Sequence, residues 1–174
     1  MSWSWLGNAI TAVAALLGVF LGGWLTVRNQ ERQWKREHAR QWRDIRLAAF
    51  SEFIAAYRQY VAFALEPTAN ITVVPHPRFP EMMPFFDDVG RPYKEKLESA
   101  ITAVRLVCEK PDTKNAAAAV VAAVRQIAAA RATSSADEVG QAQFDRLWAG
   151  QLAFRNAARA EVGLEGMDHD PPRG

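Results

Sequence analysis

The chain has a single cysteine, Cys108, and only three histidines, His38, His76 and His169. One cysteine cannot form an internal disulfide, which favours a reducing compartment such as the cytoplasm. The histidines stand at no spacing typical of metal ligands, and no glycine-rich phosphate loop or facing carboxylate pair is recognisable. We therefore expect no enzyme, no metal or other cofactor and no small-molecule substrate.

Charge is missing from residues 3–27, a stretch of 25 uncharged residues. As a helix this stretch is about 37 Å long, which exceeds the roughly 30 Å hydrocarbon thickness of a bilayer. Tryptophans near both of its ends are typical of side chains that prefer the headgroup region. The sequence therefore predicts a transmembrane helix over 3–27.

The charges that follow the uncharged stretch predict its orientation. Residues 28–46 hold seven Lys/Arg against three Asp/Glu, and the rest of the chain is close to neutral with 14 and 16. A cleaved signal peptide has its basic residues before the apolar core, whereas here they come after it. The positive-inside rule then places the N-terminus outside and the following domain in the cytoplasm. The expected membrane-interface residues are Trp3, Trp5, Trp24, Arg28, Arg32, Lys35 and Arg36.

Small residues line one face of the predicted anchor, and Gly18 and Gly22 form a GxxxG pair. Such a face allows two helices to approach closely, so Gly18 and Gly22 are candidates for dimerisation through the anchor. Glycine is also simply common in membrane helices, and this alternative stays open.

Residues 28–65 contain no glycine or proline before Pro67, which predicts one long helix continuing from the anchor. Its charged first part, 28–44, is expected to be a basic juxtamembrane stalk. Nucleic-acid binding is not expected, because Glu31, Glu37 and Asp44 interrupt the basic residues. An apolar stripe at helical spacing becomes a core face after residue 45. The stripe comprises Trp34, Trp42, Ile45, Ala49, Phe53, Ala56, Tyr60 and Ala64.

Three further helices are expected downstream. The second begins near 88–92 and runs to 110, where Pro111 ends it; the third spans about 112–132. Ser135 and Glu138 stand in capping-box register ahead of a fourth helix that stops at Gly163 and Leu164. Short connections make neighbouring helices antiparallel, so the fold class is all-α, a transmembrane helix continuing into a four-helix antiparallel bundle at 45–164. A flexible tail over 165–174 follows.

Three segments also carry a resemblance. The sequence WKREHARQWRDIRLAAFSEFIAAYRQY at 34–60, the R-L-V-x-x-x-P turn at 105–111 and FRNAARAEVGL at 154–164 follow the uncharged N-terminal stretch. In these segments the chain resembles a loose group of actinobacterial and actinophage-type membrane-anchored helical proteins. The resemblance implies a bacterial plasma membrane and supplies no activity and no catalytic residues.

The connection 67–91 contains five prolines between 67 and 84, which favours an extended chain. Long loops in compact domains are often functional. Its candidate partner-binding residues are Phe79, Met82, Met83, Phe85 and Phe86. The alternative is that Phe85 and Phe86 only cover the end of the bundle.

Taken alone, the sequence favours a membrane-tethered interaction or regulatory module at the inner face of a bacterial plasma membrane, with a protein partner or a second copy bound. The alternative is a phage- or defence-type oligomer that acts on the bilayer through its anchor.

Overall fold

The computed structural model describes the backbone of residues 4–75 and 82–164, and the side chains of residue 30 and of residues 34–75 and 83–164. Its elements are α1 (Ser4–Leu65), β1 (Ile71–Pro75), β2 (Met82–Phe86), α2 (Arg91–Val107), α3 (Pro111–Arg131), the short 3-10 helix η1 (Ala136–Glu138) and α4 (Gln141–Glu161). The chain divides into two units, Met1–Arg43 and Asp44–Gly174.

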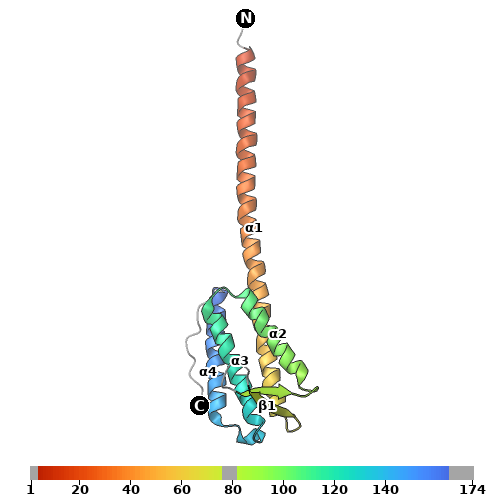
Figure 1. Ribbon diagram of the computed structural model, residues 1–174. Helices are drawn as coiled ribbons and strands as arrows, with labels where there is room; N and C mark the ends of the chain where they lie inside the picture. Colours follow the sequence, from red (N-terminus) through yellow and green to blue (C-terminus); the bar gives the residue numbers. More distant parts are fainter. Residues whose placement is uncertain (1–3, 76–81, 165–174) are drawn as a thin grey trace. The chain divides into compact units, whose positions relative to one another are not determined.

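In the second unit, the C-terminal part of α1 lies beside α2, α3 and α4 (Figure 1). Only three residues connect α2 to α3, so α3 turns back along α2, and α4 turns back along α3. The predicted antiparallel four-helix arrangement of this unit is confirmed.

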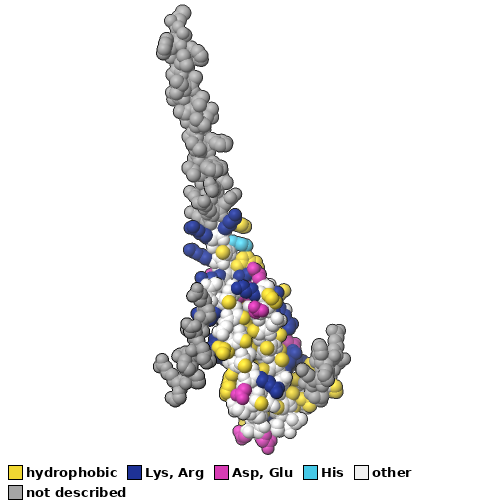
Figure 2. All heavy atoms as spheres, turned by 90° about the vertical axis from the view of Figure 1, so that its left-hand side faces the viewer, with side chains coloured by type: hydrophobic (Ala, Val, Ile, Leu, Met, Phe, Trp, Pro, Cys, Tyr) yellow, Lys and Arg dark blue, Asp and Glu magenta, His cyan; other side chains and the backbone are white. Residues whose placement is uncertain are grey.

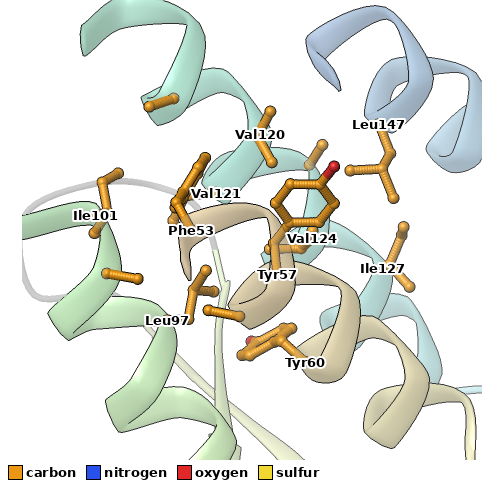
Figure 3. Packing of buried hydrophobic residues seen from close by; sticks show 14 of the residues in the cluster. Phe53, Tyr57, Tyr60, Leu97, Ile101, Val120, Val121, Val124, Ile127 and Leu147 are labelled. Atoms are coloured by element: carbon orange, nitrogen blue, oxygen red, sulfur yellow. The ribbon is translucent and has the colours of Figure 1, made fainter. Parts of the chain in front are cut away.

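The core of this unit forms where the stripe of α1 meets the other helices. Figure 3 shows Phe53, Tyr57 and Tyr60 of α1 together with Leu97 of α2 and Val124 of α3. Phe53 has no exposed surface, and its ring meets that of Phe154 of α4 edge-on at a centroid distance of 4.9 Å. Aromatic pairs in this geometry stabilise a core beyond the area that they bury.

The all-α prediction is wrong in the connection 67–91, where β1 and β2 form a two-stranded antiparallel sheet. Ile71 pairs with Phe86 and Pro75 with Met82. Proline lacks a backbone donor, yet a strand with only one neighbour tolerates it. The prolines therefore do not prevent pairing, and the sheet brings Phe86 to Tyr60 and Phe63 at ring distances of 5.0 and 5.7 Å.

The helix ends follow the predicted signals with two corrections. Gly163 has φ 75°, and the amide of Leu164 donates to the carbonyl of Arg159 at 2.8 Å, which confirms the predicted Schellman stop. Pro111, however, begins α3 instead of ending α2, because proline fits the first turn of a helix, where amides have no partner. The capping box of Ser135 and Glu138 is present, but it caps η1 rather than α4.

Among the residues whose side chains are described, no helix is both long and apolar enough to cross a membrane. The backbone of 4–27 is helical, but its side chains lie outside the described set, as does the tail 165–174. The transmembrane segment 3–27 thus stays a prediction.

Candidate functional site

A surface groove, here called the arginine groove, crosses α2, α3 and α4 and has a volume of about 430 Å³. Small side chains of α3 form part of its lining, and Met83 of β2 adds to it. Alanine side chains reach little beyond the helix backbone, so they leave room between the longer residues around them. The lining residues are Met83, Arg105, Ala118, Val121, Ala122, Arg125, Gln126, Ala129, Gln143 and Arg146.

Three arginines from three different helices reach this groove. Arg105 lies in the last turn of α2, is exposed, and has no ion pair or hydrogen bond to another described residue. Arg125 of α3 has its guanidinium 3.6 Å from the carboxylate of Glu98, and Arg146 of α4 donates to Gln126 Oε1 at 3.0 Å. The antiparallel packing of the helices is what brings these three charges together.

One residue of the lining, Gln143, has a polar atom without a partner. Gln143 Oε1 is buried and has no hydrogen-bond partner among the described residues. A buried polar atom left in this way costs free energy unless a bound group pairs with it. Among its described lining residues the groove has no Asp or Glu. Guanidinium groups bind carboxylates through two parallel hydrogen bonds, so the chemistry of the groove favours an anionic ligand with apolar parts.

A second exposed surface lies within the first unit. Trp34, His38 and Trp42 follow one another at i, i+4 and i+8 on α1, and we call them the aromatic face. The rings of Trp34 and His38 stack at 5.2 Å, and Trp42 Nε1–H donates to His38 Nε2 at 2.9 Å. Figure 2 shows dark-blue Lys and Arg side chains along this segment of the helix, with yellow hydrophobic side chains among them.

The predicted site residues fall into three groups. Lys35 and Arg36 are exposed, whereas Trp3, Trp5, Trp24, Arg28 and Arg32 lie outside the described side chains, and so do Gly18 and Gly22. Phe79 and the side chain of Met82 are likewise outside the described set. Of the remaining loop candidates, Phe85 is 50% exposed, Met83 lines the arginine groove, and Phe86 is buried in the core at 3% exposure.

A buried carboxylate joins the helices at the turn between α2 and α3. Glu161, in the last turn of α4, accepts hydrogen bonds from the amides of Glu109 and Lys110 at 2.8 and 3.2 Å and from the Thr113 hydroxyl at 2.8 Å. Burial by itself raises the pKa of Glu161, but these donors and the nearby Arg46 charge together lower it. Because α3 has no side-chain cap of its own, Glu161 caps its N-terminus from another helix.

Arg46 of α1 completes this carboxylate cap. Its Nε donates to the carbonyl of Val107 at 3.0 Å, and its guanidinium also pairs with Glu109. The neighbouring Cys108 is buried, and burial, followed by the charge of Glu161, raises the pKa of its thiol to about 11. A thiol with so high a pKa is a poor nucleophile.

No local pattern predicts the arginine groove or the carboxylate cap, since both join residues that are far apart along the chain. The aromatic face could be found from its i, i+4, i+8 spacing, although the hydrogen bond within it could not. The described residues contain no group of acidic, histidine and cysteine side chains that could hold a metal ion. Comparisons with profiles of known protein families, with curated protein sequences and with solved structures found no match.

Proposed function

We propose that the chain is a membrane-tethered interaction module, and that its arginine groove binds an acidic segment of a protein partner at the inner face of a bacterial plasma membrane. The observation that carries the proposal is the convergence of Arg105, Arg125 and Arg146 on one groove whose described lining is otherwise apolar or neutral.

The lining favours binding over catalysis. It offers guanidinium groups, amides and apolar side chains, and it includes no His, Cys, Ser, Asp or Glu to act as a nucleophile or a general base. Its apolar part suits the aliphatic side chains of an amphipathic segment, while the arginines suit carboxylates on the same segment.

The tether part of the proposal is supported by the uncharged stretch 3–27 and by the basic collar of Arg28, Arg32, Lys35 and Arg36 that follows it. Deleting residues 3–27 should move the chain from the membrane fraction to the soluble fraction after alkaline washing. A C-terminal reporter should be active only in the cytoplasm; activity on the outer face would contradict the proposed orientation.

The groove is tested with an amphipathic peptide of alternating Glu and Leu blocks, labelled with a fluorophore, and its Lys/Leu counterpart. The full chain is held in nanodiscs of zwitterionic lipid, so that the lipid does not attract either peptide. We expect the acidic peptide to bind and Arg105→Glu combined with Arg146→Glu to weaken it at least about ten-fold, because two charge-assisted contacts become repulsive.

Arg155→Glu is the matched control, because Arg155 is exposed on α4 and does not line the groove. It should change the affinity by less than about two-fold. Equal losses in the groove variant and in the control, or equal binding of the Lys/Leu peptide, would contradict the proposed groove.

The alternative, a membrane-active oligomer, rests on one observation, the GxxxG pair of Gly18 and Gly22. It predicts rapid depolarisation of cells on induced expression and loss of that effect when both glycines become leucine. Expression without depolarisation favours the interaction module.

A further inference from the structure

The aromatic face is unusual because large rings at helical spacing stay in solvent. Trp34 is 65% exposed and Trp42 is 41% exposed. Large exposed aromatic side chains at regular spacing are typical of an interface.

The contacts within this face lower the free-energy cost of burying it in an interface. The indole N–H of Trp42 is already satisfied by His38 Nε2 at 2.9 Å, and the Trp34 ring stacks on the same imidazole with the two ring planes at 9°. Burying Trp42 in an interface therefore leaves no indole N–H without an acceptor. Because the rings already contact one another, they lose little further side-chain freedom on binding.

The charges beside the face identify what covers it. At about 100° per residue, Glu37 lies about 100° to one side of His38 and Lys35 about 60° to the other side. Both are exposed. One edge of the aromatic face is therefore acidic and the other basic, while Arg36 and Arg40 point to the back of the helix.

We propose that the aromatic face pairs in parallel with the same face of a second copy of this chain. In a parallel two-fold pair, the acidic edge of each helix meets the basic edge of the other. Glu37 of one copy and Lys35 of the other are then offset by only about 3 Å along the helix axis. An antiparallel pair brings acidic edge to acidic edge and repels itself. A helix that binds an anionic lipid surface has basic residues on both edges of its apolar face. Here one edge carries Glu37, which anionic lipid would repel.

This inference does not depend on the arginine groove, which lies in the other unit. It uses only residues of the first unit and the continuous helix α1. A common insertion direction in the membrane, which the proposed anchor imposes, also keeps two copies parallel.

Cysteine crosslinking in native membranes tests the arrangement. The full chain carries Cys108→Ala and one new cysteine, introduced as Trp34→Cys, His38→Cys or Trp42→Cys. In a parallel pair each of the three positions faces its own counterpart, so all three variants should form disulfide-linked dimers on mild oxidation. In an antiparallel pair centred on His38, only His38→Cys forms them, and that result overturns the parallel arrangement.

Arg36→Cys and Arg40→Cys are the controls on the opposite face of the helix. They should crosslink at no more than about a tenth of the level of His38→Cys, because their side chains point away from the partner. Equal crosslinking on both faces, or none at any of the five positions, overturns the pairing.

Charge reversal gives an independent readout by energy transfer between labelled full-length chains in lipid vesicles. Glu37→Lys and Lys35→Glu should each weaken pairing about five-fold, since two symmetric attractions become repulsions. The double reversal should restore pairing to within about two-fold of the natural chain. A double variant no better than the single ones overturns the edge-to-edge arrangement.

Discussion

Two stretches of α1 carry the same apolar spacing and differ in what they contact. Between 49 and 64 the stripe is buried, with Phe53 at 0% and Tyr60 at 2% exposure, whereas in the aromatic face Trp34 and Trp42 are 65% and 41% exposed. Periodicity thus identifies which side of a helix is apolar, and the availability of a neighbour decides whether that side is covered. The stretch 49–64 builds the core of the domain, and the aromatic face is the surface that we propose to pair with a second copy.

The largest expected effect contrasts Phe53→Ala with Trp34→Ala. Phe53→Ala should lower the free energy of unfolding by about 4 kcal/mol, because it leaves a cavity in the core beside the Phe154 ring of α4. Trp34→Ala should cost less than about 0.5 kcal/mol, because the ring is in solvent. Urea unfolding at low protein concentration measures both, and similar losses would erase the distinction between the two stretches.

A smaller effect is expected at the carboxylate cap that supports the buried stretch. Glu161→Gln should cost about 2–3 kcal/mol at neutral pH, because an amide cannot accept from Glu109, Lys110 and Thr113 as a carboxylate does. The pKa of Glu161 is lowered in the folded chain, so its contribution is complete above the unfolded pKa and is lost as the pH falls through the folded pKa.

Urea unfolding of the natural chain and of Glu161→Gln should therefore differ most near neutral pH and converge only once the pH has fallen through the lowered pKa of Glu161. Glu138→Gln is the control, since Glu138 is fully exposed and only caps η1. It should change stability far less. A difference that persists unchanged into acid would refute the role given to the Glu161 charge.

The smallest of the three effects concerns the far end of the buried stretch. A Cβ added at Gly90 would lie 2.5 Å from a ring atom of Phe63 and 2.7 Å from one of Phe86, and both rings are buried. Gly90→Ala should cost about 1–2 kcal/mol and loosen the sheet, as amide hydrogen exchange of β1 and β2 would show. At Gly140 the added atom meets only the end of the Gln143 side chain, so Gly140→Ala should be nearly neutral.

The sequence predicts the helices well because local signals define their ends. The expected start near 88–92 and the observed start at Arg91 agree, as do the predicted third helix 112–132 and the observed α3. The Schellman stop at Gly163 is a local pattern of the same kind. The sheet was missed because proline argues against a strand, although a two-stranded sheet needs donors on one side only.

Apolar residues of α4 differ in burial in a way that the sequence does not show. Leu147 and Phe154 are buried, but Trp148 and Leu152 are 56% and 39% exposed. For the arginine groove, Arg105, Arg125 and Arg146 carry no shared motif. Their meeting follows from the packing of α2, α3 and α4, which a single sequence does not reveal.

The carboxylate cap has a consequence for synthesis. Glu161 follows the amide of Glu109 by 52 residues, so a nascent chain exposes the start of α3 long before the ribosome has made the group that caps it. When α2 and α3 leave the ribosome, the amides of Glu109 and Lys110 between them therefore still lack this carboxylate. The domain acquires its finished form only when the final turn of α4 arrives.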